Sequence, residues 1–306
     1  MKLIRKAAAL VLLAGIITST GFADKLKEIF SPEQETAEPE CENITPKRGK
    51  YAPKETESEA KATFSDAVTV MNESSGWYCQ HMKDGTRPLI PSEMSYITEH
   101  GGYYIGEDEK VIYLTFDAGY ENGNVEKILN TLKQENVPGA FFILDNLAKT
   151  NTDLVKRMVD EGHTVCNHTA KHKDMTKMTS KEDFAAELRA MEDVYRDKIG
   201  GEIARYYRPP EGKFNEQNLA WADELGYKTI FWSFAYADWD NANQMSREKA
   251  IEKIITNTHN GEVILLHPTS KTNAEILPEL IAKWREMGFT FGTLDELTGQ
   301  KGEHDE

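Results

Sequence analysis

Two residues in this chain, each with a candidate partner, have the side-chain types needed for proton transfer. Asp117 directly follows a run of β-branched and aromatic residues, and His267 directly follows another apolar run. A carboxylate can accept a proton and an imidazole can donate one, which is general acid–base chemistry. Arg208 could keep Asp117 ionised. Asp238 could hold one tautomer of His267 and raise its basicity.

Two histidines have the spacing of metal ligands. His168 and His172 lie four residues apart, and on a helical turn this spacing would put both rings on one face, within reach of one ion. Imidazole ligands favour zinc, cobalt or iron(II) over magnesium and calcium. The same spacing occurs in pairs of surface or capping histidines, so the motif alone leaves both interpretations open. Its position directly after a predicted strand favours a site.

The segment 208–212 reads Arg-Pro-Pro-Glu-Gly. Its two prolines force an extended and rigid backbone, so Arg208 could present a fixed guanidinium group to a buried carboxylate. An ordinary structural ion pair is the alternative interpretation. The backbone N–H of Glu211, directly after Pro210, could face a developing oxyanion.

Two tryptophans near Asp238 have two possible roles. Trp232 and Trp239 could line a sugar-binding groove, or they could belong to the hydrophobic core. For Trp232 the core is the favoured interpretation.

The segments between these motifs predict strands that alternate with helices. Short continuous apolar runs are typical of buried parallel strands, and several helical segments carry capping signals such as Ser180 before and Gly226 after. The predicted strands are 111–116, 139–144, 163–166, 206–208, 229–234, 262–266 and 289–293. The predicted helices are 125–135, 152–161, 180–199, 215–225, 246–259 and 273–287. This order predicts an α/β protein with a parallel sheet, in which the motifs after the strands meet at one edge.

The composition limits the possible partners. The 306 residues include 36 Lys and Arg against 51 Asp and Glu, which gives a formal net charge of −15. Binding to nucleic acid phosphates needs a basic face, so we expect no nucleic acid partner. The cysteines Cys41, Cys79 and Cys166 suggest neither a disulfide framework nor a metal cluster. Cys166 is expected to be a small buried residue, and a bond between Cys41 and Cys79 stays open.

The N-terminal third predicts segments that precede the main domain. Residues 1–23 combine a basic start, an apolar stretch and small residues, as in a signal peptide or N-terminal anchor. We therefore expect export to the extracellular space or the cell wall, with a membrane tether through an uncleaved N-terminus as the alternative. Residues 24–63 predict a flexible acidic linker, and residues 64–109 an extension packed on the barrel. Nothing suggests an obligate partner chain, so we expect a monomer.

Five motifs, in order, resemble those of the polysaccharide deacetylase family, the group that shares the nodulation-protein-B homology domain. They are Thr115-Phe116-Asp117-Ala118-Gly119, His168 to His172, Arg208-Pro209-Pro210, Asp238-Trp239 and Leu265-Leu266-His267. The resemblance places this homology domain at residues 110–300. It implies a distorted (β/α)7 barrel with an irregular N-terminal extension.

Other segments are similar to one subgroup, the delta-lactam-biosynthetic de-N-acetylases. These segments are Gly101-Gly102-Tyr103-Tyr104, Tyr120-Glu121-Asn122-Gly123, Arg-Pro-Pro-x-Gly and the Asp-Trp pair. The resemblance implies that the substrate is the N-acetylmuramic acid of a peptidoglycan glycan strand, and that deacetylation leads to muramic-δ-lactam in the spore cortex. It implies substrate contacts at Pro210, Glu211, Trp239 and Tyr120.

The resemblance also implies metal-assisted amide hydrolysis. A divalent metal, expected to be zinc with cobalt or iron as alternatives, would be held by His168 and His172 and would polarise the acetyl carbonyl. Asp117 would be the general base, oriented by Arg208. His267, tuned by Asp238, would protonate the departing amine.

One residue departs from the pattern of most of the family. Ala118 stands where most members have a second Asp, which is their third metal ligand, and an alanine cannot coordinate. The delta-lactam subgroup also lacks this Asp and commonly carries Asn there. We therefore expect weaker metal binding than with three protein ligands. Glu121 and Asn122 are candidates to compensate.

Two other functions stay open at this point. One is deacetylation of N-acetylglucosamine in peptidoglycan or a chitin-like glycan. The other is a glycan-binding module that lost catalysis through Ala118. The presence of Asp117, Arg208, Asp238 and His267 argues against the second, because binding alone needs neither a base nor an acid.

Overall fold

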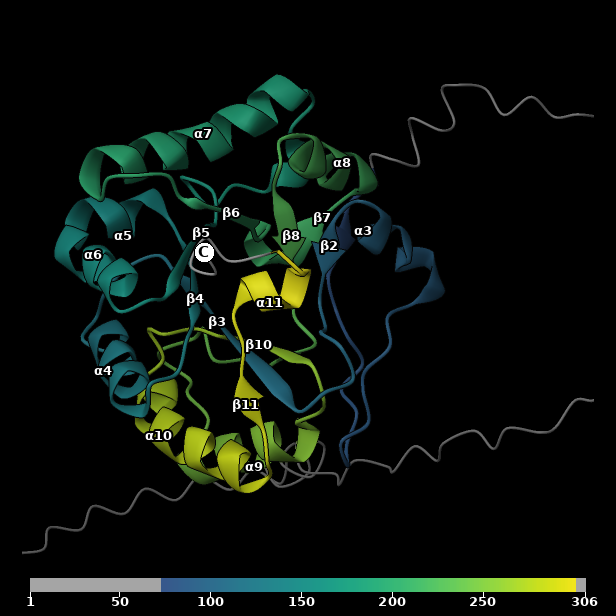
Figure 1. Cartoon of the computed structure of the whole chain (residues 1–306). Coiled ribbons are helices and arrows are strands. Elements are labelled where there is room, and N and C mark those ends of the chain that lie inside the picture. The colour runs from purple at the N-terminus through teal and green to yellow at the C-terminus, as the bar shows by residue number, and fades with distance from the viewer. Residues whose placement is uncertain (1–72, 301–306) are drawn as a thin grey trace, which may run out of the picture. The chain divides into compact units, whose positions relative to one another are not determined.

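The computed structural model describes residues 73–300 (Figure 1). The predicted signal peptide or anchor 1–23, the predicted linker 24–63, Cys41 and residues 64–72 lie outside the described residues. Within the part of the chain that is described, no helix is long and apolar enough to cross a membrane.

Most of the strands form a curled parallel sheet. Within the described residues its order is β2-β8-β6-β5-β4-β3-β10-β9, and β11 pairs with the start of β3. The strands are β2 (Gly102–Tyr103), β3 (Val111–Ala118), β4 (Ala140–Ile143), β5 (Thr164–Asn167), β6 (Ala204–Tyr207), β8 (Lys228–Ile230), β9 (Phe234–Ala235), β10 (Glu262–Leu266) and β11 (Thr290–Phe291). A separate antiparallel pair joins β1 (Ser75–Gly76) to β7 (Lys213–Phe214).

Helices surround this sheet (Figure 1). They are α3 (Tyr96–Glu99), α4 (Val125–Glu135), α5 (Asp145–Thr150), α6 (Thr152–Asp160), α7 (Lys181–Lys198), α8 (Glu216–Glu224), α9 (Arg247–Asn257), α10 (Lys271–Glu286) and α11 (Leu294–Thr298). Residues 73–300 also contain the short 3-10 turns η1 (Ser92–Met94), η2 (Met175–Lys177) and η3 (Pro210–Gly212). The predicted capping signals explain several ends: the Ser180 side chain accepts a hydrogen bond from the Asp183 N–H at the start of α7, and Gly226 adopts a φ of 79° after α8.

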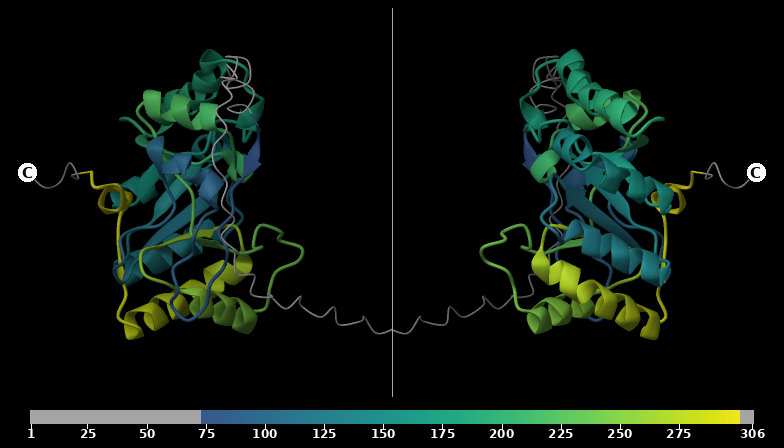
Figure 2. Two further views of the ribbon diagram at one scale, coloured as in Figure 1. Left: turned by 90° about the vertical axis from the view of Figure 1, so that its right-hand side faces the viewer. Right: turned by 90° about the vertical axis from the view of Figure 1, so that its left-hand side faces the viewer.

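Successive side chains of β3 point to opposite faces of the sheet, and each face packs in a different hydrophobic core. Ile112, Leu114, Phe116 and Ala118 are buried in the outer core, beneath α4 and α10. The side chains between them face the barrel interior, where Tyr113 packs in a cluster with Leu294 and Leu297 of α11. Helix α11 thus covers one end of the barrel, and Figure 1 shows it lying across the strands. Figure 2 shows the loop between β9 and α9 projecting at the opposite end.

The predicted distorted (β/α)7 barrel is confirmed, but the predicted strand 229–234 is wrong as a single element. It forms two strands, β8 and β9. The backbone changes partner between them, because the Phe231 N–H donates to the Tyr103 carbonyl while the Ser233 N–H donates to the Val263 carbonyl. An apolar run of this kind does not reveal that its partner strand changes midway. The barrel is distorted at this point.

Candidate active site

Asp117 and Arg208 form an ion pair at the carboxyl ends of β3 and β6. The Arg208 Nη1 donates to Asp117 Oδ1 over 2.8 Å. Arg208 is fully buried and is held by three further hydrogen bonds, to the Ile230 carbonyl, the Phe231 carbonyl and the Thr115 hydroxyl. Its guanidinium group also lies 4.1 Å from the centre of the Phe142 ring. The predicted contact is therefore present, and the guanidinium group has little freedom to move.

The surroundings of Asp117 favour its ionised form. Burial alone would raise the pKa of this carboxyl group, but Arg208, His168 and His267 together lower it below its usual range. The carboxylate is thus ready to accept a proton at neutral pH. Its second oxygen, Oδ2, lies 3.6 Å from the Nε2 of His168.

The two predicted metal ligands lie in a loop after β5, so the expectation of a helical turn is wrong. Thr169 and His172 adopt left-handed backbone conformations, with φ of 70° and 55°. Side chains stabilise this shape: Asn167 Oδ1 accepts from the Thr169 N–H, and Thr169 Oγ1 accepts from the His172 N–H. The loop places the two imidazole rings edge to face, 5.0 Å between centroids.

The tautomer of His168 is set by its backbone partner. Its Nδ1 lies 2.8 Å from the Arg208 carbonyl oxygen, which can only accept, so Nδ1 carries the proton. Nε2 therefore keeps a lone pair, directed to the side where Asp117 lies. Burial lowers the pKa of His168 to about 4, so the ring is neutral at physiological pH, as a metal ligand must be.

This donor set fits a metal held by two imidazoles. Within residues 73–300, no group of three or more His, Cys, Asp or Glu side chains could hold an ion. Ala118, where the resemblance places a third ligand in most of the family, is fully buried and belongs to the same core cluster as Ala170, which lies between the two histidines. Water or substrate would have to fill the remaining coordination positions.

Asp238 and His267 form the second predicted pair, after β9 and β10. His267 Nδ1 lies 2.7 Å from Asp238 Oδ1, and the His267 N–H donates to Asp238 Oδ2 over 2.8 Å. Asn273 Nδ2 also donates to Asp238 Oδ2, over 2.6 Å. Burial opposes a charge on His267, but Asp238 outweighs it and the pKa of His267 is raised. Its protonated form can therefore act as an acid at neutral pH.

The predicted substrate-contacting residues lie around these pairs. Trp239 is 62% exposed and its ring lies 6.2 Å from that of His267. Tyr120 is also exposed, and its hydroxyl accepts a hydrogen bond from Asn241. Pro210 is buried in η3. The Glu211 side chain forms an ion pair with Lys213 at 2.6 Å.

Three supporting residues were not identified from the sequence. Thr115 accepts from Arg208 and donates to the Ile264 carbonyl, and Asn273 holds Asp238. Asn167 joins the histidine loop to the Tyr227 hydroxyl and the Leu188 carbonyl. A signal exists only for Thr115, which lies two residues before Asp117 and so shares its face of β3.

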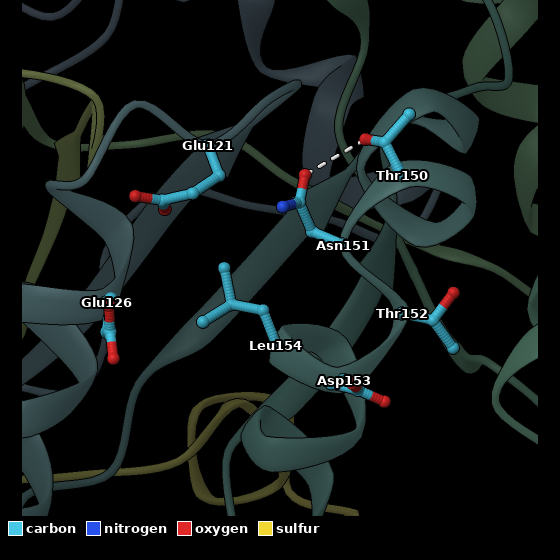
Figure 3. A pocket seen from close by; sticks show the side chains of 7 residues that line it. All are labelled: Glu121, Glu126, Thr150, Asn151, Thr152, Asp153 and Leu154. Atoms are coloured by element: carbon cyan, nitrogen blue, oxygen red, sulfur yellow. Dashed lines mark hydrogen bonds between the residues drawn. The ribbon is translucent and has the colours of Figure 1, made fainter.

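A hollow of about 410 Å³ lies between the loop after β3 and the start of α6. Figure 3 shows its lining residues, which are Glu121, Glu126, Thr150, Asn151, Thr152, Asp153 and Leu154. It contains neither member of either acid–base pair and neither histidine. The hollow therefore does not define the reacting centre.

Comparison with known proteins identifies related chains. The profile of a family described as polysaccharide deacetylase matches residues 105–230. The chain is 38% identical to the peptidoglycan-N-acetylmuramic acid deacetylase PdaA of Bacillus subtilis, over 77% of this chain and 90% of that protein. It is 34% identical to the peptidoglycan-N-acetylglucosamine deacetylase PgdA of Listeria monocytogenes, over 63% of this chain and 40% of that protein. The solved structure of Bacillus subtilis PdaA, a family 4 carbohydrate esterase, matches with a TM-score of 0.72 at 36% identity and covers 75% of this chain and 98% of that chain.

Proposed function

The chain belongs to the polysaccharide deacetylase family, and we propose that it removes the acetyl group from N-acetylmuramic acid residues of peptidoglycan. The enzyme class follows from the family: such enzymes hydrolyse N-acetyl amide bonds on polysaccharides. The choice of muramic acid rests on the similarity to PdaA and on Ala118 with its flanking residues, which are similar to the delta-lactam subgroup.

One observation carries the proposed chemistry: the candidate base with its partner and the candidate acid with its partner lie at the same end of the barrel. Asp117 is held by Arg208 at 2.8 Å, and His267 is held by Asp238 at 2.7 Å. The two pairs are close enough that His267 helps to lower the pKa of Asp117, and Asp117 helps to raise that of His267. A hydrolysis that needs a base and an acid at once would find both in the required protonation states.

The proposed reaction assigns one task to each side chain. Asp117 accepts a proton from the attacking water while Arg208 fixes its orientation. The water oxygen forms a bond to the acetyl carbon, and the bond between this carbon and the sugar nitrogen breaks. His267 gives its proton to the departing amine, and Asp238 stabilises the imidazolium before transfer. Acetate and a free amino sugar leave.

We propose that His168 and His172 hold a divalent metal, zinc being the expected ion. When bound, this ion would supply Lewis-acid polarisation of the acetyl carbonyl. The hydrogen bond from His168 Nδ1 to the Arg208 carbonyl supports this assignment, because metal-binding histidines usually donate their second N–H to such an acceptor. The backbone N–H of Glu211 is proposed to bind the developing oxyanion.

The proposed setting is the cell wall. The substrate would be a glycan strand that lies along the exposed rings of Trp239 and Tyr120, since aromatic faces are a common platform for sugars. The product amine could close on the lactyl carboxylate of muramic acid to give muramic-δ-lactam. We also propose that the protein is exported and acts as a monomer.

The deciding experiment compares two sugars in defined peptidoglycan fragments. Acetate release would be measured from glycan chains in which only the muramic acid or only the glucosamine residue is N-acetylated, with and without added zinc or cobalt. We expect release from the first substrate and a dependence on metal. Release only from the second would favour a glucosamine deacetylase, and no release from any N-acetylated glycan would support the glycan-binding alternative.

A further inference from the structure

Trp77 lies in the N-terminal extension but packs into the structure around the candidate active site. It is 7% exposed and stacks on Phe231, with ring centroids 4.4 Å apart and planes inclined by 23°. Tyr104 and Phe214 complete an aromatic cluster around it. Stacked aromatic pairs stabilise a protein by more than the burial of their surface area alone. The Trp77 side chain is therefore firmly held.

Trp77 makes hydrogen bonds to two separate segments of the barrel. Its backbone N–H donates to the Gly212 carbonyl over 2.8 Å, next to the pairing of β1 with β7. Its indole Nε1 donates to the Trp232 carbonyl over 2.9 Å. Trp77 therefore links the turn after Arg208 to the segment 230–232, which begins with the last residue of β8.

Both of these segments hold Arg208. Arg208 begins the first segment, and the second supplies the Ile230 and Phe231 carbonyl oxygens that accept from its Nε and Nη2 at 2.9 and 3.1 Å. A displacement of either segment would break bonds of a guanidinium group that has no access to water. The ion pair with Asp117 would move with it.

The turn after Arg208 is unfavourable by itself. Glu211 and Gly212 both have left-handed backbone conformations, with φ of 58° and 65°, and a side chain such as that of Glu211 seldom adopts one. A conformation of this kind persists where the surroundings hold it. At Gly212 an added Cβ would lie 3.2 Å from the Trp77 Cβ and 2.9 Å from the Trp232 ring, so the turn is held closely by these two residues.

We propose that Trp77 is a positioning residue for catalysis. Its two hydrogen bonds and its stacking on Phe231 hold the turn 209–212 against residues 231–232, and we call this arrangement the clamp. The N-terminal extension thereby becomes part of the structure that orients Arg208 and the Glu211 N–H. This proposal rests on the proposed function for its catalytic consequence. Its structural part, the ordering of the turn, can be measured separately.

The test compares three variants of the full chain. Trp77→Ala removes the stack and the indole hydrogen bond, whereas Trp77→Phe keeps an aromatic ring on Phe231. Ile97→Ala is the control for general destabilisation, because Ile97 is fully buried in the same hydrophobic cluster as Trp77 but makes no hydrogen bond to the turn. Steady-state deacetylation, thermal unfolding and hydrogen–deuterium exchange of the peptide 208–214 would be measured for each.

We expect Trp77→Ala to lower kcat by about tenfold or more, because small displacements of catalytic groups are costly, with a smaller change in KM. Ile97→Ala should lower the melting temperature comparably but keep kcat within about twofold of the parent, and Trp77→Phe should recover most of the lost rate. Exchange in 208–214 should accelerate in Trp77→Ala alone. Equal exchange in Trp77→Ala and Ile97→Ala would overturn the proposal, as would equal kcat. If the parent releases no acetate but Trp77→Ala still accelerates exchange, the clamp stands and the proposed function fails.

Discussion

Arg208 donates to Asp117 across 2.8 Å although the two residues are 91 positions apart in the chain. The guanidinium group is fully buried and bonded to three other acceptors, so its position is set before any substrate arrives. The position of the Asp117 carboxylate is set by its hydrogen bond to this immobile guanidinium group. The pair thus fixes both the ionisation of the carboxylate and the direction in which its free oxygen points.

The first prediction concerns the pH dependence of deacetylation. Burial would lower the pKa of His267, and the carboxylate of Asp238 raises it instead. In Asp238→Asn the burial effect dominates, so His267 loses its proton at lower pH and the basic limb of kcat/KM moves to lower pH. We expect a rate loss of about tenfold or more above neutral pH.

The control for this prediction is Asp240→Asn. Asp240 is exposed and caps the Ala242 N–H, so the variant removes the same charge two residues away without touching His267. Its pH profile should match that of the parent. Identical basic limbs in the parent and Asp238→Asn would show that Asp238 does not set the protonation of the acid.

A second prediction concerns metal affinity. Ala118→Asp would return a carboxylate to the position of the third ligand, so we expect zinc to bind more tightly. The gain should be at least roughly 10–100-fold, because residues that only hydrogen-bond to metal ligands already contribute that much to metal affinity. Zinc dissociation constants would be measured by competition with a chromogenic chelator, with Ala118→Ser as the control that adds a polar atom but no charge. A destabilised Ala118→Asp protein with unchanged affinity would mean that the new carboxylate lies in the outer core and does not reach the ion.

A third prediction concerns stability rather than catalysis. Burial of Glu262 at the start of β10 raises its pKa to about 8, above the ordinary value of 4.5 that holds in the unfolded chain. The folded protein thus binds a proton that the unfolded chain releases between these two values, so its stability is full at low pH and falls as pH rises through this window. The loss should reach up to about 5 kcal/mol.

Glu262→Gln should remove this dependence, because the amide is neutral at every pH. Denaturant unfolding of the parent and the variant at pH 6 and pH 9 would test it. The parent should lose more stability than the variant between the two values. Parallel losses in both proteins would show that Glu262 does not titrate in this range.

The sequence predicted the elements whose local pattern is strong. The apolar run before Asp117 and the amphipathic helices appear close to their predicted bounds, because burial of one face imposes a period on the sequence. The division of 229–234 into β8 and β9 was missed, because it depends on a change of the neighbouring strand, from β2 to β10, which the local sequence does not encode. The loop of His168 and His172 was mistaken for a helical turn, since its shape depends on left-handed conformations at Thr169 and His172.

The supporting residues of the site were harder to predict than its motifs. Trp77 contacts Phe231 and the Trp232 carbonyl from 154 and 155 positions away, and nothing in its own segment indicates these partners. Asn273 occupies an ordinary place in the first turn of α10, where its bond to Asp238 has no local signal. Long-range contacts of this kind depend on how the sheet curls and which segments it brings together, and not on local propensity.

The most direct test of the account is the rate of acetate release by Asp117→Asn. The amide keeps the size of the side chain and an oxygen that can accept from Arg208, but it cannot act as a base at neutral pH. We predict that kcat falls by about 100-fold or more, while binding of an N-acetylated muramic acid fragment, measured by calorimetry, stays within about threefold of the parent because no binding contact is removed. A near-normal rate in Asp117→Asn would contradict the account, because Asp117 would then not be the base.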